Sequence, residues 1–303
     1  MSPNQIGTLA QVEPETILNR VQNQIEPRLA SLLDQLQTLS PELLDAMRYS
    51  VLAPGKRLRP ALCVASAESV GESGDAVLDA AAALEMVHVF SLIHDDLPAI
   101  DDDDLRRGIP TCHKKFGEAL AILAGDALFS LAFETLSHAS AEPKTILKCI
   151  QILAKASGTD GLVGGEVSDV LHENRPVTEE ALAWIHSRKT GRLIAASCEI
   201  GGLLGGASPT QVSALREFGE LTGMAFQIAD DLLNVTGNAS QLGKAVGSDE
   251  AKMKATYPAL YGVERSKLMA IEASEKAQNI AKELLPTPQS LQFLAHFAVH
   301  RLH

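Results

Sequence analysis

A stretch of acidic residues between Asp95 and Gly108 carries the most evident chemistry in this sequence. It reads DDLPAIDDDDLRRG, so six carboxylates fall within ten residues and two arginines follow them. A second acidic pair, Asp230 and Asp231, lies far downstream. Two like charges about 4 Å apart repel by roughly 4 kcal/mol near a protein surface, so the folded chain needs something to offset this repulsion. A hard divalent cation is the simplest candidate.

The residue types around the acids point to the same chemistry. Mg²⁺ prefers carboxylate oxygen, keeps several waters and is usually completed by substrate phosphates. Arg106 and Arg107 suit a phosphate whose charge exceeds what metal ions neutralise. The pattern therefore predicts a Mg²⁺-diphosphate site. The alternative is a solvated acidic loop, but the apolar runs MVHVFSLIH and AILAGDAL on either side favour the end of a buried helix.

A basic segment reading GKRLRP suggests a second anion site. It places Lys56, Arg57 and Arg59 at an expected helix start, where the helix dipole and free N–H groups favour an anion. The alternative is a solvated helix start. His88 lies seven residues before Asp95, two helical turns away on nearly the same face. A lone histidine in an apolar helix is more often a hydrogen-bonded core residue.

Two lysines farther along the chain are also candidates. Lys189 belongs to the charged segment Arg188 to Gly191, which interrupts an apolar helical stretch; its alternative role is in a surface turn. Lys244 follows the second acidic pair, and its long side chain could equally extend to solvent.

Composition limits the class of protein. The chain has 303 residues and a net charge of −12, which disfavours a nucleic-acid partner because such proteins usually present a basic face. No GxSxG, HExxH or Walker-type motif supports a hydrolase or nucleotide-binding function. The N-terminus lacks the pattern of a secretory signal, and no uncharged apolar run reaches the length of a membrane span. We therefore expect a cytoplasmic protein. Its cysteines are widely spaced, without a CxxC pair: Cys63, Cys112, Cys149 and Cys198.

The distribution of residues predicts an all-α fold in one domain over residues 1–303, with residues 1–14 frayed. Long stretches are rich in Ala, Leu, Ile and Glu, which favour helices. Helices that are apolar nearly all round belong in the middle of a large bundle. We expect helices over residues 15–39, 41–53, 58–71, 75–97, 116–137, 143–157, 178–204, 209–233, 257–284 and 288–301.

Both acidic groups fall near expected helix ends. Pro98 should end its helix one residue earlier, which leaves Asp95 on the last turn and Asp101 on the following loop. Asp230 and Asn234 are four residues apart and share a helix face. Two acidic helix ends that face one cavity would hold Mg²⁺ ions, three in number, around one diphosphate. Mn²⁺ is expected to substitute for Mg²⁺.

Several segments of the sequence together resemble a known protein family. The run LIHDDLPAIDDDDLRRG with PTCHKKFGEALAILAGDAL resembles the first aspartate-rich region of bacterial short-chain polyprenyl diphosphate synthases, and FQIADDLLNVTG resembles the second. The segments PGKRLRP, GLVGGEVSD, IHSRKTG and KATYPALYG match others in the same order, so the resemblance covers residues 41–265. It implies an all-helical bundle around a deep central cavity, a homodimer, and the joining of an allylic diphosphate to isopentenyl diphosphate.

The resemblance also implies a role for each matched residue. The implied metal ligands are Asp95, Asp101 and Asp230. The implied residues for the allylic diphosphate are Arg106, Lys189 and Lys244. The implied residues for isopentenyl diphosphate are Lys56, Arg59, His88 and Arg107. The residues implied to line the reacting centre are Thr190 and Gln227.

The expected product follows from the residue five positions before Asp95, which lines the cavity floor in this family. Phe90 occupies that position and Ser91 follows it. An aromatic residue there resembles bacterial farnesyl diphosphate synthases, which make the C15 product from dimethylallyl or geranyl diphosphate. The alternative role of Phe90 is core packing. The alternative product is C20 geranylgeranyl diphosphate.

Three residues depart from the family pattern. Asn234 replaces the last aspartate of the second acidic motif, Glu166 replaces a usual glutamine, and Pro54 replaces a usual glycine. They bear on rate or substrate preference. Two further functional classes remain open. A terpene cyclase also uses aspartate-rich metal sites, but it has no need of a second diphosphate site. An inactive partner subunit of a heteromeric synthase is disfavoured because both the acidic and the basic groups are present.

Overall fold

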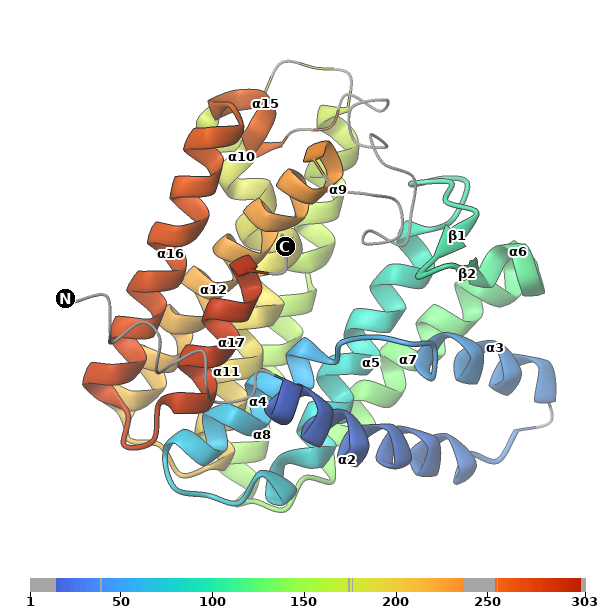
Figure 1. Ribbon diagram of the computed structural model, residues 1–303. Coiled ribbons are helices and arrows are strands. Elements are labelled where there is room, and N and C mark those ends of the chain that lie inside the picture. Colours follow the sequence, from blue (N-terminus) through green and yellow to red (C-terminus); the bar gives the residue numbers. More distant parts are fainter. Residues whose placement is uncertain are drawn as a thin grey trace.

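The predicted all-α fold is confirmed. The computed structural model describes residues 15–38, 40–173, 175, 177–236, 254 and 256–300, and these form a helical bundle with one short hairpin (Figure 1). In chain order the helical elements are α2 (Glu15–Asp34), α3 (Pro41–Val51), α4 (Leu58–Ser69), the 3-10 turn η1 (Gly74–Val77), α5 (Leu78–Asp95), α6 (Cys112–Phe116), α7 (Glu118–Ser137), α8 (Pro143–Ser157), α9 (Leu162–His172), α10 (Glu179–His186), the π-helical turn η2 (Ser187–Gly191), α11 (Arg192–Leu204), α12 (Pro209–Thr236), α15 (Tyr257–Tyr261), α16 (Val263–Leu284) and α17 (Gln289–His300).

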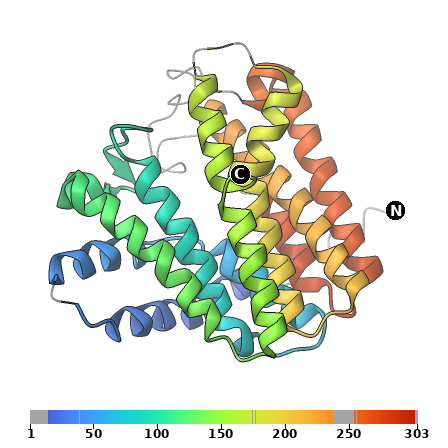
Figure 2. The same cartoon turned by 180° about the vertical axis from the view of Figure 1, so that it is seen from behind.

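Helix α5 lies at the centre of one half of the bundle. It packs against α7, α4, α11 and α2 and buries side chains around its whole circumference, as its uniformly apolar sequence predicts. In the other half, α12 packs between α11 and α16 (Figures 1 and 2). The C-terminal ends of α5 and α12, which carry the two acidic groups, are thereby set on separate helices of one rigid bundle.

The helix boundaries follow local sequence signals. Pro41 occupies the first turn of α3, where its missing N–H costs nothing. The side chain of Thr178 accepts a hydrogen bond of 3.2 Å from the N–H of Ala181 and so caps α10. Helix α5 ends at Asp95, three residues before Pro98, and Asp96 is its C-cap. The sequence therefore locates the end of this functionally important helix to within two residues.

Several local features differ from the sequence prediction; for example, the helix expected over 257–284 is divided at Gly262 into α15 and α16. Helix α9 was not predicted, because two adjacent glycines, Gly164 and Gly165, weaken its helical signal. Strands β1 (Leu105–Arg106) and β2 (Ile109–Pro110) pair as an antiparallel hairpin with two residues each, too short to show alternation. The segment that interrupts the predicted helix over 178–204 does not leave the helix; it forms η2, a π-helical turn that joins α10 directly to α11.

Two helical stretches have the length and hydropathy that a membrane span needs. They are residues 75–95 and α7, and 72% and 44% of their most apolar windows is buried inside the structure. Core helices of a bundle meet the same criteria, so this observation is weak support for a span. The four cysteines are all buried and unpaired.

Candidate active site

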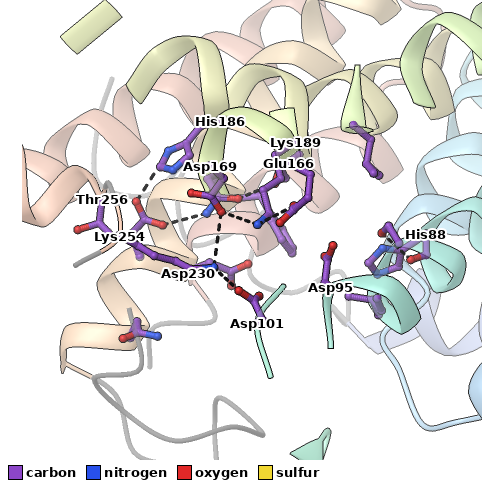
Figure 3. A pocket seen from close by; sticks show the side chains of 18 of the residues that line it. His88, Asp95, Asp101, Glu166, Asp169, His186, Lys189, Asp230, Lys254 and Thr256 are labelled. Atoms are coloured by element: carbon purple, nitrogen blue, oxygen red, sulfur yellow. Dashed lines mark hydrogen bonds and ion pairs between the residues drawn. The ribbon is translucent and has the colours of Figure 1, made fainter. Parts of the chain in front are cut away.

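A cavity of 320 Å³ lies between the two acidic helix ends, and residues from α4, α5, α9, η2 and α12 line it. Figure 3 shows carboxylates and lysines that reach into it from opposite sides. The sequence-predicted residues that line the cavity are Arg59, His88, Ser91, Asp95, Asp101, Arg106, Arg107, Lys189, Thr190, Gln227 and Asp230. The chain thus brings the two acidic groups and most of the predicted cations to one place.

Three of the predicted site residues are not among those that line the cavity. Lys56 is exposed, and its ammonium lies 5.1 Å from the centre of the Phe297 ring on α17. Phe90 is buried and packs against Phe129 of α7, with ring centroids 4.8 Å apart. Lys244 lies outside the described residues, so its role stays a prediction.

The backbone after α5 turns back on itself and brings both parts of the first acidic group into the cavity. The N–H of Asp101 donates to the carbonyl of Asp95 at 2.8 Å, and the N–H of Asp103 donates to the carbonyl of Asp96 at 3.2 Å. Asp102, at the turn, has a left-handed φ of 50°. Because of this reversal, Asp95 and Asp101 both line the cavity although a straight helix would separate them.

The surroundings of Asp95 oppose a negative charge on its carboxyl group. Removal of its carboxyl from water and the nearby carboxylate of Glu166 raise the pKa of Asp95 to about 8. Lys189 and Arg106 lower this pKa but do not offset both causes. Asp95 therefore lies where an additional cation would be stabilised.

Two lysines pair with three other carboxylates of the cavity, those of Asp101, Glu166 and Asp169 (Figure 3). The Nζ of Lys189 lies 2.6 Å from Asp169 and 2.8 Å from Glu166. The Nζ of Lys254 lies 2.6 Å from Asp101 and 3.6 Å from Asp169. Burial opposes the charge of Lys189, but the carboxylates of Asp169 and Glu166 raise its pKa well above the usual value. Burial would raise the pKa of Asp169, yet the two lysines bring it below the usual value.

Sequence reasoning gave no role to Lys254 or Asp169. Both lie in segments with a recognisable family pattern, KATYPALYG and GLVGGEVSD. Asp169 was missed because α9 was not predicted. Lys254 was missed because it is 153 positions from the Asp101 that it contacts, and no local pattern reveals such a pair.

The two aspartates of the second acidic pair have different surroundings. Both line the cavity, but Asp231 is also buried and accepts hydrogen bonds from the protein. The Oδ1 atom of Asp231 accepts a 2.9 Å hydrogen bond from Gln227, and its Oδ2 atom accepts one of 2.9 Å from the N–H of Tyr257. Gln227 in turn accepts a 2.5 Å hydrogen bond from Thr190. The two residues predicted at the reacting centre are therefore joined directly.

His88, Arg59 and Arg107 form a cluster of hydrogen-bond donors. Burial and the charges of Arg59 and Arg107 lower the pKa of His88 far below the usual range, so this imidazole is neutral. Burial also lowers the pKa of Arg59 to about 10, which leaves it charged at neutral pH. These three side chains line the cavity and contain no carboxylate among them. An anion is the ligand that fits such a cluster.

Arg106 is held at the edge of the first acidic group. Its Nε atom donates to Asp96 at 2.9 Å, and its Nη2 atom lies 3.3 Å from Asp103. Asp96 is therefore occupied by an arginine, while Asp95 faces the cavity. Within the acidic run, Asp96 and Asp103 therefore pair with Arg106, whereas Asp95 and Asp101 line the cavity.

The carboxylates fit a magnesium site that a ligand completes. Among the described residues, no three His, Cys, Asp or Glu side chains converge closely enough to hold a metal ion by themselves. Mg²⁺ in proteins is typically held by one or two carboxylates, waters and substrate phosphates. The oxygen-only donors Asp95, Asp101 and Asp230, together with the raised pKa of Asp95, suit that kind of binding.

Comparison with known proteins shows to which family the chain belongs. Residues 40–286 match the polyprenyl synthetase family. The chain belongs to this family. It is 40% identical to a farnesyl diphosphate synthase of Geobacillus stearothermophilus over 97% of the chain and 100% of that protein. It is 46% identical to the large subunit 1 of a chloroplastic heterodimeric geranylgeranyl pyrophosphate synthase of Arabidopsis thaliana, over 78% of the chain.

The likeness extends to solved structures. A Helicobacter pylori geranyltransferase, solved in complex with magnesium and isoprenyl diphosphate, superimposes with a TM-score of 0.81 at 33% identity. That match covers 93% of this chain and 96% of the geranyltransferase. The alignment with the Arabidopsis protein spans 65% of that protein's length, whereas the bacterial relatives match over nearly their whole length.

Proposed function

We propose that this chain is a magnesium-dependent head-to-tail prenyltransferase that condenses isopentenyl diphosphate with dimethylallyl or geranyl diphosphate. The observation that carries the proposal is a cavity with two chemically distinct anion sites. One combines Asp95, Asp101 and Asp230 with lysines, which suits a metal-bound diphosphate. The other combines Arg59 and His88 without a carboxylate of its own, which suits a diphosphate bound without metal.

The first site would ionise the allylic substrate. The three aspartates would hold Mg²⁺, which when bound supplies positive charge to the diphosphate as the C–O bond breaks. Lys189 keeps its proton because of Asp169 and Glu166, so it remains a charged donor to the leaving group. Preorganised donors of this kind stabilise the charge that develops on the departing oxygen.

The second site would hold isopentenyl diphosphate beside the first substrate. Its double bond then attacks the allylic carbocation, and holding both reactants in one cavity removes most of the entropy cost of the encounter. The departing diphosphate can accept the proton that leaves afterwards, so no side chain needs to act as a base. Apolar residues in the lining, Leu92, Leu162 and Phe226, help to exclude water from the cation.

For the product we propose C15 farnesyl diphosphate. Two observations support this choice: the match to the Geobacillus farnesyl diphosphate synthase over that protein's full length, and Phe90 at the fifth position before Asp95. The ring of Phe90 is wedged against Phe129 and His94, so it forms part of a fixed aromatic wall between α5 and α7.

A specific observation favours C20 geranylgeranyl diphosphate as the second candidate. Phe90 is not among the residues that line the cavity, whereas the smaller Ser91 is. The plant relative with 46% identity is also named for the C20 product. A terpene cyclase and an inactive partner subunit are less well supported, because neither needs Arg59 and His88 beside a complete acidic site.

One incubation tests the proposal. The protein is mixed with labelled isopentenyl diphosphate, Mg²⁺ and one starter at a time: dimethylallyl, geranyl or farnesyl diphosphate. Chromatography then resolves the chain lengths, and a parallel sample contains excess EDTA. We expect C15 from the first two starters, little consumption of the third, and no product in EDTA, with activity restored by Mg²⁺ or Mn²⁺. A C20 product would select the second candidate, and consumption of an allylic diphosphate alone would select a cyclase.

We also propose a cytoplasmic homodimer without a nucleic-acid partner. Exposed apolar side chains on α7 and α9 support the second copy as the partner, since large apolar patches commonly mark interaction sites. These side chains are Ile122, Leu123, Val163, Val167, Val170 and Leu171.

A further inference from the structure

Arg57 is the largest of the fully buried side chains in the described part of the chain, and it does not line the cavity. Its sequence neighbours behave differently: Lys56 is exposed, and Arg59 lines the cavity. A fully buried guanidinium is costly unless its donors are satisfied, so the contacts of Arg57 show what it is for.

The guanidinium of Arg57 joins four parts of the fold. Its Nη1 atom donates to Glu85 on α5 at 2.8 Å. Its Nη2 atom donates to two carbonyls at 2.9 Å, those of Val51 at the end of α3 and Ala53 in the following loop. Its Nε atom lies 3.6 Å from Glu26 on α2. One side chain therefore ties the loop before α4 to three helices.

The backbone of this loop is held in an uncommon conformation. Arg57 has a left-handed φ of 49° although it is not a glycine, and such a residue persists only where its surroundings fix it. Arg107 grips the same loop from the cavity side: its Nη1 atom donates to the carbonyl of Pro54 at 2.8 Å. A Cβ at Gly55 would overlap the guanidinium of Arg107, so the loop and Arg107 fit together without space.

We propose that Arg57 and Glu85 are positioning residues for isopentenyl diphosphate. Glu85 lies three residues before His88 on α5, one helical turn away. The ion pair between Arg57 and Glu85 thus sets the loop that carries Lys56, and the start of α4 that carries Arg59, against the helix that carries His88. This inference rests on the proposed function, since it concerns the second anion site of the same cavity. Neither Arg57 nor Glu85 touches the substrate.

The physical gain is preorganisation. Long cationic side chains lose conformational freedom when they grasp an anion, and a scaffold that fixes their backbone beforehand reduces this cost of binding. The second site is built from arginines and a neutral imidazole, so its affinity for isopentenyl diphosphate should depend on this scaffold and not on metal.

Two variants and one matched control test the inference. Arg57→Lys keeps the positive charge but loses the two hydrogen bonds to the carbonyls of Val51 and Ala53. Glu85→Gln keeps the size of the side chain but loses its charge. The control is Arg28→Lys, which weakens another contact between α2 and α5, the 2.6 Å ion pair of Arg28 with Asp79. Calorimetry with isopentenyl diphosphate alone, without metal, reports on the second site. Steady-state kinetics give the two KM values, and circular dichroism verifies folding.

We expect both variants to lose at least tenfold in affinity for isopentenyl diphosphate and to raise its KM by a similar factor. The KM for geranyl diphosphate and the Mg²⁺ concentration for half-activation should change less than twofold, and the control should match the wild type. The double variant should lose little more than either single one, because the two side chains act as one unit.

Several outcomes would overturn the inference while the proposed function stands. One is wild-type affinity for isopentenyl diphosphate in folded variants of an active enzyme. Another is an equal rise of both KM values, which would indicate a general structural role. If Arg57→Lys does not fold, Glu85→Gln decides, and loss of folding in both would assign the pair to stability alone. A wild-type protein that neither binds nor consumes isopentenyl diphosphate would remove the proposed function, and this inference with it.

Discussion

At the scale of single residues, the pKa values of two carboxyl groups in one cavity are shifted in opposite directions. Burial and Glu166 raise the pKa of Asp95 to about 8, whereas two lysines bring the pKa of Asp169 below its usual value. Both groups are removed from water, so the difference comes from their neighbours: Asp169 has cations within 2.6 and 3.6 Å. Asp95 is the carboxylate whose ionisation the ligand-free protein does not support.

We predict that Asp95→Asn stabilises the metal-free protein while it lowers turnover at least a hundredfold. A carboxyl group whose pKa is about 8 in the folded state and about 3.9 in the unfolded state costs stability above pH 4, and the cost grows until pH 8. The Tm of the variant in EDTA should exceed that of the wild type by about 2 °C or more at pH 9. The gap should shrink toward pH 5, and a variant that melts below the wild type at pH 9 would refute this.

A second prediction concerns the protonation of His88. Its pKa lies far below the usual range because of burial and nearby arginines, and a bound diphosphate would offset those positive charges and raise it. At pH 6 the wild type should therefore take up more protons on binding isopentenyl diphosphate than His88→Gln does. Calorimetry in buffers with different ionisation enthalpies measures this difference. Equal proton uptake by the two proteins would show that His88 does not face the ligand.

At the scale of elements, packing of α9 against η2 sets the position of Lys189. A Cβ at Gly165 would overlap the backbone nitrogen of Lys189, so only a glycine permits this approach. Gly191, in η2 itself, has no such neighbour; the nearest atom to a Cβ there is 3.7 Å away. These two glycines offer a matched pair of substitutions.

We predict that Gly165→Ala lowers kcat more than tenfold, whereas Gly191→Ala changes it less than threefold. The added methyl group at Gly165 pushes η2 outward and displaces the ammonium of Lys189 from the cavity, and overpacking of this kind typically costs about 1–3 kcal/mol of stability. Turnover and thermal melting of both variants measure the effect. Similar kcat values for the two would contradict a fixed contact between α9 and η2.

The same elements show what the sequence could and could not predict. Uniformly apolar stretches located α5 and α7, and Pro98 located the end of α5 because proline cannot continue a helix. Gly165, one of the two glycines that weaken the signal of α9, is required by close packing on η2, which is a tertiary requirement. Lys254 reaches Asp101 across 153 positions, so its partner emerges only once the chain is folded. Phe90 was placed at the cavity floor by resemblance; its ring packs against Phe129 of α7, and its role in chain length stays a prediction.

At the scale of the whole molecule, α7 and α9 both carry exposed apolar side chains. Leu123 on α7 is 53% exposed, and Val167 on α9 is also 53% exposed. We predict that Leu123→Glu shifts the protein from dimer to monomer in sedimentation experiments, because a buried unpaired charge opposes association. Leu268→Glu is the control, since Leu268 is equally exposed but lies on a different helix, α16. A monomeric wild type, or dissociation by the control alone, would place the interface elsewhere.

The lysines in the cavity also bear on how the molecule responds to its surroundings. Lys254 and Lys189 already balance Asp101, Asp169 and Glu166, so binding of magnesium at this site would exchange one set of cations for another. Part of the attraction between metal and carboxylate would be offset by the loss of the lysine's ion pair. The displaced ammonium group could then bind the diphosphate. Under the proposed function, uptake of magnesium and uptake of allylic diphosphate would consequently be linked, and each would strengthen the other by the same factor. The enzyme's apparent affinity for the allylic diphosphate should therefore rise with the free magnesium concentration of the compartment in which it works.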